Sequence, residues 1–157
     1  MIKIREYNDS DLHQAASLIS ETFRKYNYKD KQPESSEEYA EYYGSKSNID
    51  DINKRFKDSS PFFVAELDGQ VVGVLRAEKN RIVNLFVKEG YQRRGIGKML
   101  FKKYEYECKK LGYKEIVLRS QLHAIPFYQA IQFKKTTGIR HKHGLKIQPM
   151  KKKLSYG

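Results

Sequence analysis

Residues 81–111 constrain the fold more than any other stretch, because they join a strand pattern, a glycine-bearing turn and an amphipathic helix. The apolar run at 82–87 is rich in β-branched and aromatic residues, which is typical of a buried strand. The apolar residues that follow recur at helical spacing, and they are Ile96, Met99, Leu100, Tyr104, Cys108 and Leu111. A chain with this pattern must leave a strand, bend at Gly95 and Gly97, and enter a helix.

The bend has the chemistry of an anion site. It carries Gln92, Arg93, Arg94, Gly95, Ile96, Gly97 and Lys98. Because the two glycines lack a Cβ, the backbone there can approach a ligand closely. The first amides of a helix have no intrahelical acceptor, so they point outward at the positive end of the helix dipole. The turn is therefore predicted to bind a phosphate group.

Two common nucleotide-binding motifs are excluded at this turn. A dinucleotide-binding fingerprint would place a third glycine at position 100, where the chain has Leu100. A P-loop would follow Gly90 and Gly95 with lysine and then serine or threonine, but Ile96 and Gly97 stand there. The phosphate ligand must therefore belong to another class.

The turn closely resembles the acyl-CoA loop of the GNAT superfamily of N-acetyltransferases. That signature reads Gln/Arg-x-x-Gly-x-Gly/Ala after a strand that ends in apolar-x-Val, and Gln92, Gly95 and Gly97 match it. The strand end ahead of the loop is formed by Leu85, Phe86 and Val87.

Residues 120–133 resemble the family's other signature, a strand end followed by a short helix with Ala-x-x-Phe-Tyr that closes on Gly-Phe. The match is carried by Ala124, Phe127, Tyr128 and Phe133. Gln121 replaces the asparagine usually found seven residues before the tyrosine, and Gln132 replaces the glycine before the last phenylalanine. The two signatures occur in the family's order, and the resemblance covers about residues 62–133.

The resemblance implies a single α/β domain over residues 1–157, with a mixed, mostly antiparallel central sheet of about six or seven strands and about four flanking helices. Its fourth and fifth strands would be parallel and splayed apart. Local patterns agree with this order: Asp68 and Gly69 predict a hairpin between strands at 62–67 and 71–75. A helix is expected from Asn8 or Asp9 to about Tyr26. Further helices are expected from 35, at 49–57 and at about 124–131, and further strands at 114–119 and 145–154, with Pro149 implying an edge or a bulge in the last strand.

By the same resemblance, acetyl-CoA is the co-substrate, and its pantetheine arm would fill the gap between the splayed strands. The implied cofactor contacts are Leu85, Phe86, Val87, Gln92, Arg93, Arg94, Gly95, Ile96, Gly97, Lys98 and Gln121. A backbone amide near Phe86 or Val87 would stabilise the oxyanion. Tyr128 would be the general acid, since a phenol with a pKa of about 10 can protonate a thiolate whose conjugate acid has a pKa near about 8.5.

The proton acceptor is left open by the sequence. Some family members carry a glutamate early in the fifth strand, but Ile116 occupies that position here. Glu78 and His123 are the candidates, acting directly or through water, and each has an alternative role as a surface carboxylate or a helix-start histidine. His141 and His143 flank one lysine in an expected turn, and two histidines do not make a metal site, so no metal is expected.

Residues between the first two strands are expected to form part of the acceptor wall in this fold. Tyr39, Tyr42 and Tyr43 would either line that pocket or cover the sheet. The acidic residues that could face the pocket with them are Glu34, Glu37, Glu38 and Glu41.

Composition adds a strong positive charge. The 31 Lys and Arg against 19 Asp and Glu give a formal net charge of +12, which attracts anionic partners such as CoA or nucleic acid. The lysines are dispersed and no nucleic-acid-binding signature is present, so a nucleic-acid-binding module is the weakest alternative. No stretch approaches the roughly 20 apolar residues that span a bilayer, and no signal peptide is recognised, so a cytoplasmic enzyme without membrane contact is expected.

These observations predict an N-acetyltransferase that transfers an acetyl group from acetyl-CoA to a primary amine of a small molecule or of a peptide or protein N-terminus by direct attack. A surface this basic argues against a polyamine acceptor unless the acidic residues face the pocket. The alternative is a non-catalytic acyl-CoA-binding or sensor domain with the same turn and no working base. Edge strands of this fold often pair, which leaves a homodimer open.

Overall fold

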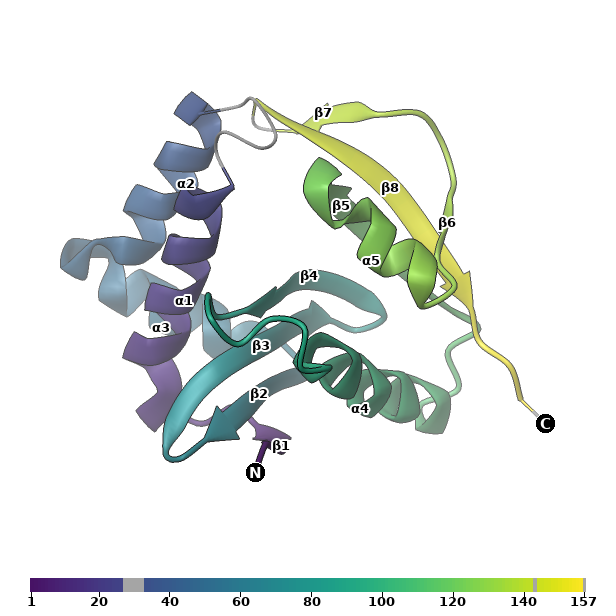
Figure 1. Ribbon diagram of the computed structural model, residues 1–157, viewed down its shortest axis with the longest axis horizontal. Helices are drawn as coiled ribbons and strands as arrows, with labels where there is room; N and C mark the ends of the chain where they lie inside the picture. Colours follow the sequence, from purple (N-terminus) through teal and green to yellow (C-terminus); the bar gives the residue numbers. More distant parts are fainter. Residues whose placement is uncertain (27–32, 143, 157) are drawn as a thin grey trace.

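The computed structural model describes residues 1–26, 33–142 and 144–156, and of residues 33–36 it describes the backbone alone. The described residues form an eight-stranded sheet in the order β1-β2-β3-β4-β5-β8-β6, with β7 also paired to β8 (Figure 1). The strands are β1 Lys3–Glu6, β2 Phe62–Leu67, β3 Gln70–Glu78, β4 Arg81–Val87, β5 Glu115–Gln121, β6 Lys134–Lys135, β7 Arg140–Lys142 and β8 Leu145–Lys153. Neighbouring strands are antiparallel except β4 and β5, which are parallel. The predicted α/β class and mostly antiparallel sheet are confirmed.

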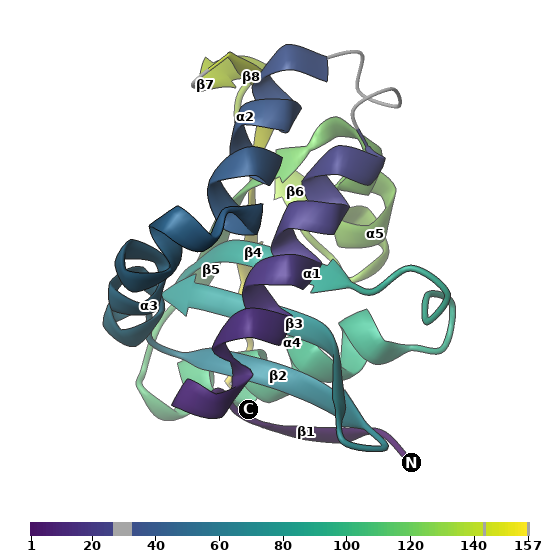
Figure 2. The same cartoon turned by 90° about the vertical axis from the view of Figure 1, so that its left-hand side faces the viewer.

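Helices cover both faces of the sheet. They are α1 Leu12–Lys25, α2 Pro33–Gly44, α3 Ile49–Asp58, α4 Ile96–Lys110 and α5 Ile125–Ala130, with 3-10 helices η1 Asp9–Asp11, η2 Lys46–Asn48 and η3 Leu122–Ala124. Figure 2 shows α1, α2 and α3 together in front of the sheet. Alternation along β2 divides the core between the two faces. Phe62 and Val64 pack with α1 to α3, whereas Phe63 and Ala65 pack with α4.

The predicted hairpin between β2 and β3 forms at Asp68 and Gly69. Both residues have positive φ, 51° and 79°, which is the backbone that such a two-residue turn requires. A second tight turn at Lys79 and Asn80 leads into β4, so that β2, β3 and β4 form an antiparallel meander.

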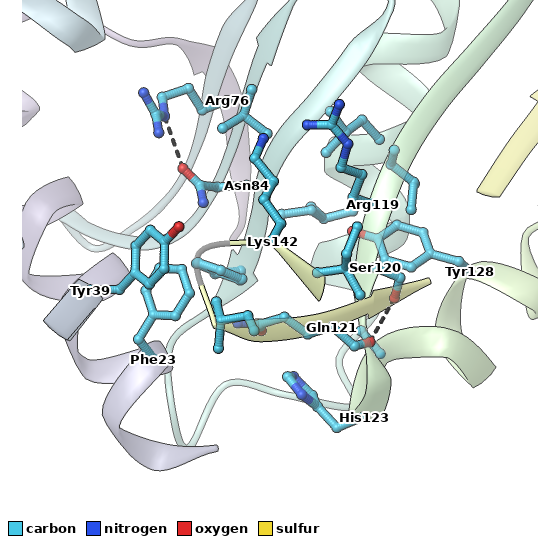
Figure 3. Close-up of a pocket in the computed structure, with 18 of the residues that line it drawn as sticks. Phe23, Tyr39, Arg76, Asn84, Arg119, Ser120, Gln121, His123, Tyr128 and Lys142 are labelled. Atoms are coloured by element: carbon cyan, nitrogen blue, oxygen red, sulfur yellow. Dashed lines mark hydrogen bonds between the residues drawn. The ribbon is translucent and has the colours of Figure 1, made fainter. Parts of the chain in front are cut away.

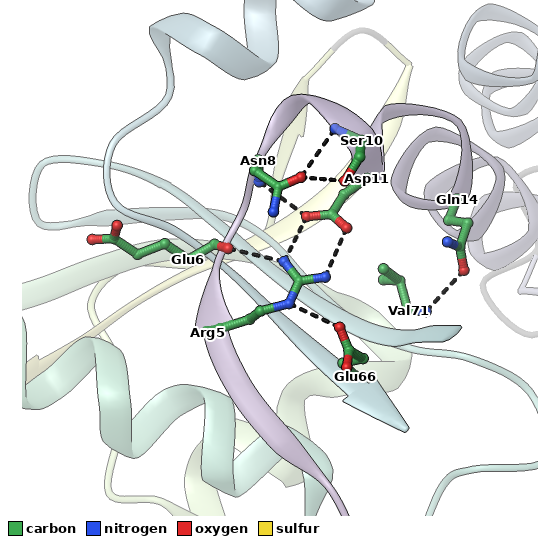
Figure 4. A network of polar contacts seen from close by, with 8 residues as sticks. All are labelled: Arg5, Glu6, Asn8, Ser10, Asp11, Gln14, Glu66 and Val71. Atoms are coloured by element: carbon green, nitrogen blue, oxygen red, sulfur yellow. Dashed lines mark hydrogen bonds and ion pairs between the residues drawn. The ribbon is translucent and has the colours of Figure 1, made fainter. Parts of the chain in front are cut away.

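The start of the first helix differs in detail from the prediction. Asn8 is a helix cap as expected, but it caps η1, and the α-helix begins after it at Leu12. The Asp11 carboxylate accepts from the Asn8 amide at 2.9 Å and from both terminal nitrogens of Arg5 at 2.8 Å (Figure 4). The Arg5 Nε in turn donates to Glu66 at 3.0 Å. This network ties β1, the helix start and β2 together.

The sequence implied an edge or a bulge at Pro149. It lies neither on an edge strand nor at a bulge against β5, because β8 pairs in unbroken register with β5 on one side and has β6 and β7 on the other. The partners on the outer side are interrupted opposite Pro149. Its carbonyl accepts from the Thr136 amide at 3.1 Å, so its nitrogen, which points the same way along a strand, faces that interruption. The missing N–H of Pro149 therefore removes no hydrogen bond between strands.

The sheet parts between β4 and β5. These strands share two residue pairs, Arg81 with Val117 and Ile82 with Leu118, although both strands continue beyond them. The β4–β5 seam is defined here as these two pairs. Beyond the seam the two strands diverge, as the prediction of splayed strands required.

A bulge in β4 accompanies the divergence. Asn84 pairs with Arg76 and Ile82 with Ala77, so Val83 is an extra residue between them. An extra residue bends a strand and increases its local twist. The bend falls directly after the seam and turns the rest of β4 away from β5.

Candidate active site

A cavity of about 200 Å³, open to solvent, lies where β4 and β5 part (Figure 3). The two diverging strands supply its walls with Arg81, Ile82, Val83, Asn84, Leu85, Phe86, Leu118, Arg119, Ser120 and Gln121. Other elements add Phe23, Tyr39, Tyr43, Arg76, His123, Ala124, Tyr128, Lys142, Leu145 and Ile147. The opening is thus built by the sheet itself, and helices and the β7–β8 hairpin close its sides.

The predicted phosphate turn connects β4 to α4. Gly95 directly precedes the helix and has a φ of +78°. The space beside its Cα is open, since no atom lies within 4 Å of where a Cβ would be. No side chain caps the first turn of α4, so its amides are not satisfied by a cap. Arg93 also has positive φ, 64°. The backbone therefore forms an exposed bend that ends on free helical amides, as an anion site needs.

The side chains of this turn divide into inward and outward ones. Ile96 is buried in the core beneath α4, so only its backbone faces the turn. Arg93, Arg94 and Lys98 are exposed, and the Arg94 guanidinium lies 5.2 Å from the centre of the Tyr91 ring. Three cationic side chains are therefore available around the bend.

Gln92 joins the turn to the end of α1. Its amide nitrogen donates to the Tyr26 hydroxyl at 3.1 Å, and its oxygen accepts from Lys25 at 3.3 Å. The Tyr26 ring is stacked on His123, with 3.8 Å between ring centres and 6° between planes. These contacts connect the phosphate turn with the start of η3, on the other side of the parted strands.

Gly97 has a role that the sequence did not reveal. A Cβ at Gly97 would lie 3.1 Å from Cζ of Phe127, so this glycine makes room for an aromatic ring of α5. Helices α4 and α5 consequently approach one another closely, beside Tyr128.

Tyr128 is placed by α5 in the wall of the cavity. Its ring packs edge-on against Phe127 and Phe133, and it is 6% exposed. Burial raises the pKa of the Tyr128 phenol above its ordinary value of about 10. The phenol is therefore held in its protonated form, which is the form a general acid requires.

The predicted cofactor contacts are distributed along one path. Leu85, Phe86 and Gln121 line the cavity, and Val87 leads from β4 toward the turn. Gln121 is the last residue of β5 and precedes η3. The structure thus brings these residues and Tyr128 around the parted strands, with the turn at the end of β4.

The two candidate bases occupy different places. His123 lines the cavity, whereas Glu78 is not among the lining residues. Glu78 is at the end of β3, where its carboxylate accepts from Arg81 at 2.7 Å. Within the described chain, no Asp or Glu lines the cavity.

The tyrosines and acids before β2 separate into two groups. Tyr39 and Tyr43 line the cavity, whereas Tyr42 bonds to Asp51 on α3. Glu37, Glu38 and Glu41 border a different, shallow surface hollow. The side chain of Glu34, like His143, lies outside the described residues.

Several lining residues were missed by the sequence reading, and two of them form a buried pair. Arg76 and Asn84 are buried partners across β3 and β4, and Nε of Arg76 donates to Oδ1 of Asn84 at 2.9 Å. The sequence did contain a signal for Arg76, because this charged residue interrupts the apolar run of a strand. Charged residues are seldom buried unless they are paired or functional.

Comparison with known proteins agrees with this geometry. The model of the acetyltransferase (GNAT) domain family matches residues 27–154. A GCN5-related N-acetyltransferase from Rhodopseudomonas palustris has a similar structure, with a TM-score of 0.85 and 19% identity, over 97% of this chain and 95% of that one. The PaiA N-acetyltransferase from Thermoplasma acidophilum in complex with coenzyme A has a TM-score of 0.74 and 24% identity, over 98% of this chain and 99% of that one. An acetyltransferase of the GNAT family from Staphylococcus aureus has a TM-score of 0.70 and 20% identity, over 99% of this chain and 100% of that one.

The fold and the site thus define an acetyl-CoA acetyltransferase. The chain belongs to the GNAT acetyltransferase family, which confirms the resemblance drawn from the two sequence signatures. Among the described residues, no group of three or more His, Cys, Asp or Glu side chains is arranged to hold a metal ion. In the same described part, no helix has the length and apolar character needed to cross a membrane.

Proposed function

We propose that this protein transfers an acetyl group from acetyl-CoA to the nitrogen of a primary amine, with Tyr128 as the general acid. The observation that carries the proposal is that β4 and β5 separate after two residue pairs and that Tyr128 stands in the wall of the resulting cavity. A cavity of this kind inside a sheet leaves strand edges without partners, and an extended chain with amide groups can take their place.

The residues present fit the co-substrate. Backbone groups of Leu85 and Val87 on the β5 side would pair with the pantetheine amides, and Gln121 would contact the arm from the facing strand. The pyrophosphate would lie on the amides of the turn, where Gly95 leaves open space. Arg93, Arg94 and Lys98 supply charge around these amides, so each of them alone is dispensable.

The reaction that this site supports is a direct attack. The neutral amine nitrogen attacks the acetyl carbonyl carbon, the C–N bond forms and the C–S bond breaks. Tyr128 gives its proton to the departing sulfur, and an amide near Phe86 or Val87 stabilises the oxyanion. The proton lost from the amine passes to water, with His123 in the cavity wall as the nearer candidate relay and Glu78 as a candidate that acts through water.

One observation favours a second candidate function. Because no carboxylate among the described residues lines the cavity, a non-catalytic acyl-CoA-binding or sensor domain also fits. Such a domain would bind acetyl-CoA without thiol release in the presence of any amine.

A thiol-release assay distinguishes the two functions. Acetyl-CoA is incubated with the protein and a panel of small amines, amino acids and peptides, and the wild type is compared with Tyr128→Phe and the matched control Tyr106→Phe, an exposed tyrosine on α4. Acceptor-dependent release is expected, with kcat about 100-fold lower in Tyr128→Phe and unchanged in the control. Acetyl-CoA binding without release by any amine would overturn catalysis, and equal rates in both variants would remove Tyr128 from the mechanism.

A further inference from the structure

Four cationic side chains gather around the candidate active site. Arg76, Arg81, Arg119 and Lys142 line its cavity, and they come from β3, β4, β5 and β7. Figure 3 shows the nitrogen ends of Arg119 and Lys142 on the same side of the cavity as Arg76, with His123 on the opposite side. The β3–β4 hairpin and the more distant strands β5 and β7 thus place positive charge at one location.

Arg76 is buried without a carboxylate partner. It is 5% exposed, and among the described residues its side chain donates to the neutral oxygens of Asn84 at 2.9 Å, Tyr43 at 3.0 Å and Ser59 at 3.4 Å. The Phe56 ring covers the guanidinium at 5.2 Å. Removing a charge from water costs several kcal/mol unless an opposite charge approaches it. The described fold supplies no such charge for Arg76.

Arg119 and Lys142 add to this imbalance. Both are exposed, and neither forms an ion pair with a described residue. Partial desolvation of its amino group, although the residue is largely exposed, and then the positive charges of Arg119 and Arg81 lower the pKa of Lys142, and Glu78 offsets part of that effect. These cations therefore repel one another, and a bound anion would relieve the repulsion.

The phosphates of CoA are not the anions that this cluster is placed to receive. The exposed turn that fits the pyrophosphate, residues 92–98, does not line the cavity. The cations lie instead beside the seam, at the closed end of the parted strands, where Arg81 belongs to the last paired residues. Under the proposed function, they face the space that remains for the acetyl acceptor.

We propose that the acceptor is a small primary amine that also carries a carboxylate or a phosphate, and that Arg119 and Lys142 hold this anionic group while Arg76 adds its field. The inference rests on the proposed function and narrows its substrate class. The amine is the nucleophile of the direct attack, so the products are the N-acetylated anion and CoA thiol. Polyamines and other cationic acceptors are disfavoured, because they would bring positive charge to Arg76, Arg119 and Lys142, whereas only Arg81 of the four cations has a carboxylate partner, Glu78, among the described residues.

Matched acceptor pairs test the proposal. β-Alanine is compared with β-alaninamide, O-phosphoethanolamine with ethanolamine, and spermidine serves as the cationic arm, with thiol release as the readout. We expect kcat/KM at least tenfold higher for the anionic member of one of these two pairs, and the pair that responds separates carboxylate from phosphate. Wild type is measured beside Arg119→Gln, Lys142→Gln and Lys142→Glu, with the exposed Lys153→Gln on β8 as the control.

The two glutamine variants are expected to raise KM for the anionic acceptor about tenfold and to leave KM for acetyl-CoA within about twofold, and Lys142→Glu should raise the acceptor KM further. Both residues are exposed, so the fold is retained, which circular dichroism checks. Release with neutral or cationic amines at equal or higher kcat/KM would overturn the inference and leave the proposed function standing. Unchanged acceptor KM in all three variants would also overturn it, and no release with any amine would overturn both proposals.

Discussion

Gly97 at the start of α4 lies against the ring of Phe127 in α5, so closely that a Cβ at Gly97 would be 3.1 Å from Cζ and 3.2 Å from Cε1 of that ring. The contact links the helix that follows the phosphate turn to the helix that carries Tyr128. A change at one helix is therefore transmitted directly to the other.

Replacing Gly97 by valine should force the two helices apart. Overpacking of this kind costs about 1–3 kcal/mol of the free energy of unfolding, which urea denaturation measures. In a Phe127→Ala background the penalty of Gly97→Val should fall by about 1 kcal/mol or more, because the ring is gone. Gly138→Val is the control, since no atom lies within 4 Å of its Cβ position. Equal penalties with and without Phe127 would contradict the contact.

Gly95 and Gly69 provide a second matched comparison. Both have positive φ, 78° and 79°, and neither has an atom within 4 Å of a Cβ position. Alanine at either site should cost about 1–2 kcal/mol of stability, because an L-residue is strained there. Only Gly95→Ala should also weaken acetyl-CoA binding, by about tenfold if a comparable energy is lost from the turn. Isothermal titration calorimetry measures this, and equal affinities in the two variants would exclude the turn from the cofactor site.

The pH dependence of turnover should reflect the buried phenol. Burial raises the pKa of Tyr128, so its proton is present at and somewhat above pH 10, the ordinary tyrosine value. At saturating substrates, kcat is expected to rise as the amine loses its proton and then to stay level through about pH 10. A decline that begins near pH 9 would contradict this role, provided that circular dichroism shows an intact fold at each pH. Tyr106→Phe should leave the profile unchanged.

The Arg5–Asp11 pair should make the free energy of unfolding decrease at acidic pH. Burial alone would raise the pKa of Asp11, but the hydrogen bonds from Arg5 and the Asn8 amide outweigh it and lower the pKa. A folded pKa below the unfolded one stabilises the protein above about pH 4, and this contribution is lost as pH falls through the folded value. Arg5→Gln should therefore cost about 3 kcal/mol at pH 6 and less at pH 2, measured by urea denaturation.

The control for this pair is Lys57→Gln, which removes an exposed ion pair with Asp9. Its effect should stay within about 0.5 kcal/mol at either pH. If the loss of unfolding free energy in Arg5→Gln were as small as in the control, or equally large at both pH values, the network of Figure 4 would not be a source of stability.

Local patterns predicted much of the fold. The turn at Asp68 and Gly69 and the helix after Gly95 follow from backbone and periodicity rules that operate within a few residues. The family resemblance assigned Tyr128 the role of general acid; the residue lines the cavity, and its role stays a prediction. These features depend on short segments of sequence.

Other features depend on partners that local patterns do not identify. The bulge at Val83 involves neither glycine nor proline, and it is defined by register against β3. The contact of Gly97 with Phe127 joins residues that are 30 apart in the chain. The charge of Arg76 was visible in the sequence, but its neutral surroundings come from Tyr43, Ser59 and the opposite strand.

The β4–β5 seam makes the sheet mechanically uneven. Two residue pairs join its halves there, whereas β3 and β4 share six and β5 and β8 share seven. The sheet is therefore weakly joined between β4 and β5, and an extended molecule bound along these two strands would connect its two halves. Slowed amide exchange on acetyl-CoA addition should accordingly concentrate in β4 and β5 and leave the distant β1–β2 pairing almost untouched.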